Sequence, residues 1–190
     1  MGSMNSICVF CGSSTGSDPM FADAARSLGR LLASRGITLV YGGSNIGLMG
    51  LVSAAARDAG GEVIGIIPER IAQNVALQPD ITLEVVPDMH ARKSRMYALA
   101  DGFISLPGGI GTLEETFEVW TWNQIGYHAK PLALYDVAGY YDRLCDFLDH
   151  TAASGFVRPV QRDALIVETD AEELLNRMAD WSPPASTKWD

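Results

Sequence analysis

The sequence predicts an α/β fold in which a mostly parallel sheet of about seven strands is flanked by helices. Short apolar runs alternate with longer segments whose apolar residues recur at helical spacing. Most residues of the runs are apolar, which is typical of strands that are buried on both faces of a sheet. These expected strands cover residues 7–10, 37–41, 63–67, 83–86, 103–106, 132–135 and 165–167.

The segments between the runs carry helix start and stop signals. Asp18-Pro19 is a cap followed by a first-turn proline, Gly36 closes the same helix, and Gly60-Gly61 closes the next one. The interval after Ile67 gives no clear signal. The expected helices cover residues 19–35, 48–59, 89–100, 113–125, 140–153 and 171–181.

One domain is expected to account for nearly the whole chain. A length of 190 residues suits one domain with a sizeable core, and no repeat, linker or low-complexity tract interrupts it. Gly2-Ser3 precedes a second methionine, Met4, which is typical of a cloning scar. We therefore expect a tag scar and lead-in at residues 1–6, the domain at 7–181 and a loose tail at 182–190.

Charge and composition exclude several classes of function. The 14 Lys+Arg and 23 Asp+Glu give a net charge of −9, which repels nucleic-acid backbones. No apolar stretch is long enough to span a membrane, and no signal segment opens the chain. We expect a cytoplasmic protein that binds neither nucleic acid nor membrane.

The cysteines and histidines predict neither disulfides nor a metal site. Three cysteines are an odd number, and the three histidines lack metal-ligand spacing. Cys8 and Cys11 have C-x-x-C spacing, but Cys8 lies inside an expected strand. That position favours plain burial over a redox pair.

Residues 107–115, Pro-Gly-Gly-Ile-Gly-Thr-Leu-Glu-Glu, form the most informative stretch. A strand, a glycine turn and a helix start in that order leave backbone N–H groups unpaired at a positive dipole end, which suits a phosphate. No lysine follows the last glycine, so this is not a Walker loop. In the other glycine-rich loop, residues 42–47, Ser44 stands where the dinucleotide-binding pattern has its second glycine. We expect a monophosphate here, although glycines in tight turns also have a purely structural explanation. The expected ligands are Gly108, Gly109, Ile110, Gly111 and Thr112.

Glu115 has two interpretations. Residues 112–115 match the S/T-x-x-E capping box, in which the glutamate only satisfies a backbone donor, and local pattern alone favours this interpretation. The helix N-terminus also favours an ionised carboxylate. Such a group could orient a ribose hydroxyl, stabilise an oxocarbenium-like centre or activate water.

Three cations follow the expected helix cap Asp88, namely Arg92, Lys93 and Arg95. The helix dipole disfavours positive charge in the first turns by about 0.3–1 kcal/mol each. We expect compensation from a bound anion or from a carboxylate such as Glu115, the alternative being a solvated face.

Together these motifs resemble the LONELY GUY (LOG) family of cytokinin riboside 5′-monophosphate phosphoribohydrolases. The resemblance runs from about Ile7 to Trp181, and the matching segments are residues 9–14, 41–50, 89–93, 107–115 and 122–131. It implies a Rossmann-like three-layer fold, a homodimer, no cofactor, and hydrolysis of an N-glycosidic bond to free base and ribose 5-phosphate. The substrate would be an adenine-type nucleoside 5′-monophosphate, either a prenylated cytokinin nucleotide or AMP.

The resemblance also assigns roles to residues. The catalytic pair would be Arg92 and Glu115. The family's active sites lie near the dimer interface, so the cluster of Trp120, Trp122 and Tyr127 is expected in the core or at a subunit contact. The residues implied in substrate and phosphate binding are Gly12, Ser13, Gly43, Met89, Lys93, Gly108, Gly109, Ile110, Gly111, Thr112, Glu114 and Thr121.

Two departures and two alternatives accompany this assignment. Ser44 replaces a glycine common in the family, and residues 71–79 lack the acidic residue that members often have near the substrate. A nucleotide- or cofactor-binding carrier of the same fold is one alternative, since fold does not fix function. The other is a lysine decarboxylase, which would need pyridoxal phosphate on one of three lysines, Lys93, Lys130 or Lys188.

Overall fold

The computed structural model describes residues 4–184, so residues 1–3 of the expected scar and lead-in (1–6) and residues 185–190 of the expected tail (182–190) lie outside the described residues. The described chain contains a seven-stranded sheet in the order β4-β3-β2-β1-β5-β6-β7, and every adjacent pair is parallel. This confirms the predicted α/β fold. The strands are β1 (Ser6–Phe10), β2 (Thr38–Tyr41), β3 (Val63–Pro68), β4 (Thr82–Val86), β5 (Gly102–Ser105), β6 (Leu132–Tyr135) and β7 (Ile166–Glu168).

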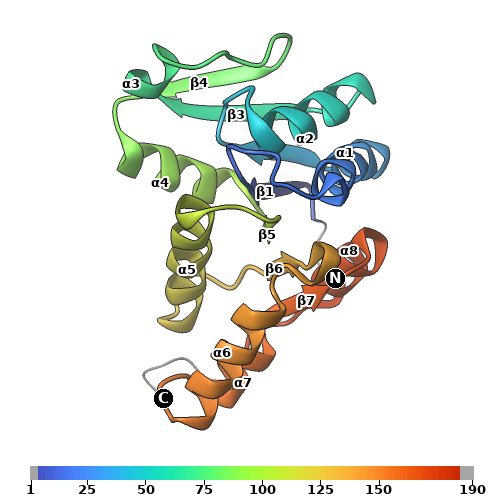
Figure 1. The fold of residues 1–190 in the computed structure, drawn as a ribbon. Coiled ribbons are helices and arrows are strands. Elements are labelled where there is room, and N and C mark those ends of the chain that lie inside the picture. The colour runs from blue at the N-terminus through green and yellow to red at the C-terminus, as the bar shows by residue number, and fades with distance from the viewer. Residues whose placement is uncertain (1–3, 185–190) are drawn as a thin grey trace.

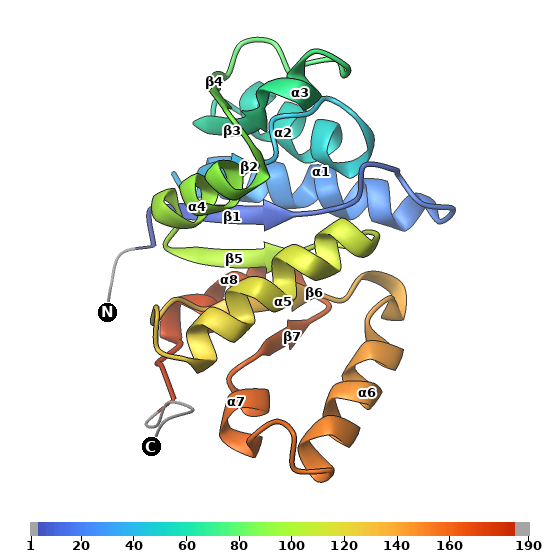
Figure 2. The ribbon, with the colours of Figure 1, turned by 90° about the vertical axis from the view of Figure 1, so that its left-hand side faces the viewer.

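Helices cover both faces of the sheet, which makes three layers (Figure 1). On one face α1 (Pro19–Ser34), α2 (Gly47–Asp58) and α8 (Ala171–Asp180) pack with the side chains of Ile7 and Val9. On the other face α4 (Met89–Leu99), α5 (Ile110–Gln124) and α6 (Asp142–Ala153) pack with Cys8 and Phe10. Figure 2 shows α4 and α5 lying across β1 and β5. The alternation along β1 follows from the two-residue period of a strand.

Three short elements were not predicted: α3 (Glu69–Ala72), η1 (Val137–Gly139) and α7 (Pro159–Asp163). Each is too short to show helical periodicity. The segment after β3 instead folds back over the β2–α2 loop, where Asn45 N donates to Ala76 O at 2.9 Å. The predicted start of α6 at residue 140 was two residues early, because Tyr140 is the C-cap of η1 and Tyr141 is the N-cap of α6.

The sheet places two glycine-rich loops side by side. Strand order reverses between β1 and β5, and such a switch point is where open parallel sheets bind ligands. Gly12, after β1, donates its N–H to the Pro107 carbonyl after β5 at 3.1 Å. None of the helices described between residues 4 and 184 is long and apolar enough to cross a membrane.

Candidate active site

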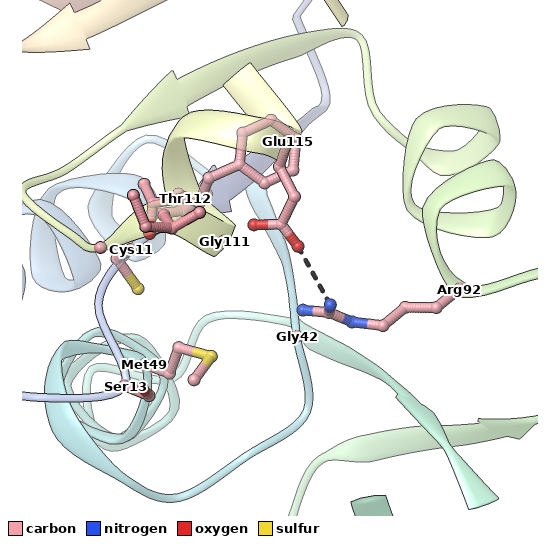
Figure 3. A pocket seen from close by; sticks show the side chains of 12 residues that line it. Cys11, Ser13, Gly42, Met49, Arg92, Gly111, Thr112 and Glu115 are labelled. Atoms are coloured by element: carbon pink, nitrogen blue, oxygen red, sulfur yellow. Dashed lines mark ion pairs between the residues drawn. The ribbon is translucent and has the colours of Figure 1, made fainter. Parts of the chain in front are cut away.

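A hollow of about 260 Å³ opens at this switch point (Figure 3). Seven of the residues predicted for the site line it: Ser13, Arg92, Gly109, Ile110, Gly111, Thr112 and Glu115. Five lining residues were not predicted: Val9, Phe10, Cys11, Gly42 and Met49. The first three directly precede Gly12 and Gly42 precedes Gly43, so adjacency to the predicted loops could have found them. Met49 lies in the matching segment 41–50 but was assigned no role there.

Arg92 of α4 and Glu115 of α5 meet across the hollow. Arg92 Nη1 lies 3.0 Å from Glu115 Oε1, and the two side chains are only 11% and 10% exposed. Figure 3 shows both side chains reaching toward each other from different helices. Arg92 Nε also donates to the Ile66 carbonyl at the end of β3, at 3.3 Å. The guanidinium is therefore fixed from two sides.

Burial and charge act in opposite directions on the Glu115 carboxyl. Burial raises its pKa above the ordinary value, and the Arg92 charge opposes this shift. The Cys11 thiol, also buried beside Glu115, has a raised pKa and stays protonated, so it offers no nucleophile. The titratable pair that faces the hollow is thus one carboxyl with its own cation, a combination often found in active sites.

Gly42, at the end of β2, leaves room for the guanidinium. A Cβ atom built on Gly42 would lie 2.3 Å from Arg92 Nη2 and 3.1 Å from Met49 Sδ. The absence of a side chain at this position is what lets Arg92 occupy its place.

The N-terminus of α5 forms another wall of the hollow. The helix begins at Ile110 after an N-cap, Gly109, that makes no side-chain cap hydrogen bond. The capping-box prediction was wrong, because Thr112 and Glu115 are the third and sixth residues of the helix rather than its cap and first turn. The first-turn N–H groups have no partner within the helix, so they are available to an anion. Gly109 and Gly111 have open space where a Cβ would lie.

Carboxylates compensate the cations of α4, as one of the two sequence-based alternatives predicted. Arg92 pairs with Glu115, and Arg95 Nε lies 2.7 Å from Glu84 Oε2. Lys93 Nζ bridges Glu114 Oε1 at 2.7 Å and Glu118 Oε1 at 2.9 Å. Burial alone would lower the pKa of Lys93, but these two carboxylates raise it. The bridge ties α4 to α5 directly beside the Arg92–Glu115 pair.

The remaining predicted residues do not line this hollow. Gly12 and Gly108 line a second hollow of about 210 Å³ on the other side of the glycine loops. Gly43, Met89, Lys93, Glu114 and Thr121 line neither of these two hollows. Thr121 is exposed on α5, and Gly43 forms a turn with φ +78° against Ile67.

The aromatic cluster divides between core and surface. Trp120 is buried, Trp122 contacts Tyr97 edge-on, and Tyr127 is 73% exposed. Within residues 4–184 no group of three or more His, Cys, Asp or Glu side chains is arranged to hold a metal ion.

Comparison with known proteins places this geometry in context. A family model described as "Possible lysine decarboxylase" matches residues 49–178. Cytokinin riboside 5′-monophosphate phosphoribohydrolase LOG3 of Arabidopsis thaliana is 47% identical over 93% of this chain and 83% of its own. A probable enzyme of the same name, LOGL2 of Oryza sativa subsp. japonica, is 44% identical over 93% of this chain and 73% of its own.

A solved structure shares the fold. The molybdenum cofactor carrier protein of Chlamydomonas reinhardtii matches with a TM-score of 0.71, covering 94% of this chain and 98% of the other. Its sequence identity is 19%, so the likeness concerns the fold alone.

Proposed function

This chain belongs to the LOG family of phosphoribohydrolases, and we propose that it hydrolyses the N-glycosidic bond of adenine-type nucleoside 5′-monophosphates. The products would be a free base and ribose 5-phosphate. Cytokinin riboside 5′-monophosphates are the proposed substrates, with AMP as the second candidate. The observation that carries the proposal is the buried Arg92–Glu115 pair, which faces the uncapped N-terminus of α5 across one hollow.

The phosphate would bind at the first turn of α5. Its N–H groups and the helix dipole favour an anion there, and neutral amides suffice for one phosphate group. Ser13, from the neighbouring loop, lines the same hollow. Binding the phosphate at one wall would direct the ribose toward Glu115, five residues further along the helix from Ile110.

Glu115 would act at the anomeric carbon. In its ionised form it stabilises the positive charge that develops on the sugar and prepares water for attack at C1′. Its raised pKa suits a general base better than that of an exposed carboxyl. Arg92 would hold Glu115 and substrate in register, and electrostatic placement in a water-poor cleft would supply much of the acceleration.

Five residues keep roles that are proposals from the resemblance. We place Lys93 and Glu114 in support of α5, because they bridge to each other. Gly43 would shape the turn next to Gly42. Met89 touches the guanidinium, with its sulfur 4.0 Å from Arg92 Nη1, and could contact the base from there. Thr121 would reach substrate only through a rearrangement or from a partner subunit.

The lysines do not fit the pyridoxal phosphate that a lysine decarboxylase would need. Lys93 is held by two carboxylates. Lys130 Nζ donates to the Tyr97 carbonyl at 2.8 Å and lies over the Tyr97 ring. Neither lines the hollow, and Lys188 lies outside the described residues. We therefore derive no step through this cofactor.

A homodimer and a cytoplasmic location complete the proposal. The exposed Tyr127 beside Trp122 at the end of α5 supports a subunit contact, because interfaces are enriched in aromatic side chains. The three cysteines are free, as is usual in a reducing compartment. Sedimentation of the purified protein at micromolar concentration tests the dimer, and a monomer would refute it.

Base release tests the activity. AMP and isopentenyladenosine 5′-monophosphate are compared with their dephosphorylated ribosides, in wild type, Glu115→Gln and the exposed control Glu173→Gln. We expect base and ribose 5-phosphate from the monophosphates only, at full rate in the control and at least about 10³-fold more slowly in Glu115→Gln. No release from any nucleotide that still binds would refute the hydrolase and leave a carrier.

A further inference from the structure

The peptide groups just before α5 are held by other parts of the protein. Tyr141 Oη donates to the Leu106 carbonyl at 2.7 Å, and Gly12 N donates to the Pro107 carbonyl at 3.1 Å. Tyr140 continues the series, because its hydroxyl donates to the carbonyl of Gly108. Three successive carbonyl oxygens thus accept hydrogen bonds from protein donors.

The contact of Tyr140 determines the direction of one N–H group. The peptide between Gly108 and Gly109 is trans, so its C=O and N–H point in opposite directions. Tyr140 and Gly108 line the second hollow, and Gly109 lines both hollows. With its carbonyl held on the side of Tyr140, this peptide directs the Gly109 N–H toward the hollow that contains Glu115.

This peptide needs an external restraint. Glycine lies on both sides of it, so no side chain opposes rotation of the peptide plane. A rotated peptide would present a carbonyl oxygen to the phosphate and repel it. A larger residue at position 108 could not restrain the peptide with its own side chain, because its Cβ would lie 2.1 Å from Thr112 Oγ1.

Tyr140 is itself held in position. It follows η1, where Ala138 and Gly139 have φ of 54° and 70°. Its ring packs edge-on against Phe21 at 5.7 Å and against Tyr141 at 4.9 Å between ring centroids. These ring contacts do not involve the hydroxyl, so removal of the oxygen leaves the packing intact.

We propose that Tyr140 is a positioning residue for phosphate recognition. Its hydroxyl fixes the Gly108–Gly109 peptide so that the Gly109 N–H donates to the phosphate of the substrate. The inference rests on the proposed function only for the identity of that substrate; the phosphate contact itself can be measured without turnover.

Calorimetric binding of three probes tests this role. Inorganic phosphate, ribose 5-phosphate and adenine are titrated into wild type, Tyr140→Phe and Tyr97→Phe. Tyr97 is the matched control, because its hydroxyl also donates to a backbone carbonyl, that of Tyr127 at 3.4 Å. We expect Tyr140→Phe to bind phosphate and ribose 5-phosphate about 3- to 10-fold more weakly, as for loss of one hydrogen bond, with adenine affinity unchanged. Tyr97→Phe should match wild type for all three probes.

The outcomes separate this inference from the proposed activity. Equal phosphate affinity in wild type and Tyr140→Phe overturns it, as does equal weakening of phosphate and adenine, which indicates general disruption. Absence of phosphate binding to wild type also overturns it, although base release could still establish the hydrolase. Conversely, a phosphate-selective loss in Tyr140→Phe supports the inference even if no nucleotide is hydrolysed.

Discussion

Replacing Gly42 by alanine should disable the site chiefly by displacing Arg92. The new Cβ would lie 2.3 Å from Arg92 Nη2, whereas ordinary contact begins at 3.4 Å, so restoring ordinary contact moves the guanidinium by about 3.4 − 2.3 = 1.1 Å. The backbone of Gly42 is not in the left-handed region, so alanine adds no strain there. The guanidinium is the far end of the flexible Arg92 side chain, so it moves more readily than the backbone of Gly42.

The size of the effect follows from this displacement. A shift of about 1 Å in a catalytic group can reduce a rate by about 10²-fold, or about 2.7 kcal/mol in the activation free energy. Here it would break the 3.0 Å contact between Arg92 and Glu115. We therefore expect kcat for base release to fall about 10²-fold, with a melting temperature close to that of wild type.

A double-mutant cycle with Arg92→Ala provides the assay. If Gly42→Ala acts through Arg92, it should cost almost nothing once Arg92 is absent. Gly155→Ala is the matched control, since its Cβ would meet nothing within 4 Å and its φ of +80° gives it a stability cost of about 1 kcal/mol. That control should lose stability and keep activity. A kcat for Gly42→Ala within threefold of wild type would refute the reasoning, as would full additivity in the cycle.

Three further predictions concern stability. Lys93→Met should lower the free energy of unfolding in urea by about 1–2 kcal/mol, less than for a fully buried pair because Glu114 is 52% exposed. No change in this free energy would contradict a net stabilising role for the bridge. Gly29→Ala should destabilise by about 1–3 kcal/mol by overpacking, since its Cβ would lie 2.3 Å from the Val52 carbonyl, and a neutral result would contradict the close α1–α2 packing. Burial lowers the pKa of His128, so the unfolded chain binds the proton more readily. The stability that this histidine contributes is complete above about pH 6.5 and is lost as pH falls through the lower folded pKa. Between pH 7.5 and 5, the melting temperature of His128→Gln should thus fall less steeply with decreasing pH than that of wild type. Identical slopes of melting temperature against pH would contradict this assignment.

The strands could be predicted almost completely from the sequence. Each of the seven apolar runs corresponds to a strand whose ends differ by at most one residue from the expected ones. Parallel strands that are buried on both faces leave a largely apolar run, and even the edge strand β4, which contains Glu84, keeps enough apolar residues to be found. The short helices α3 and α7 leave none, because four or five residues do not complete a helical period pattern.

The site was predictable where chemistry and sequence position coincide. Arg92 stood out because a cation follows a helix start, where the dipole opposes it, and the structure supplies the carboxylate that compensates it. Glu115 was ambiguous because its helix was expected to begin at residue 113, whereas the glycine segment itself forms the first turn. Gly42 and Met49 lie in the matching segment 41–50, but neither was assigned a role, since that role comes from the path of the Arg92 side chain on a distant helix.

Burying the Arg92–Glu115 pair costs folding free energy, and this cost indicates that the pair serves function rather than stability. Removing two charges from water carries a penalty of several kcal/mol per ion, and apolar replacements of similar volume are often as stable or more so. Arg95 and Glu84 make a comparable contact at 2.7 Å with far more exposure, so α4 can be tied down at lower cost. The Arg92–Glu115 pair also needs glycine at position 42, and it borders a helix N-terminus that has no side-chain cap. Apolar side chains packed in its place would stabilise the chain more. What the pair provides is a desolvated carboxylate held beside a helix N-terminus that is open to an anion, and the proposed cleavage of a phosphorylated nucleoside depends on that arrangement.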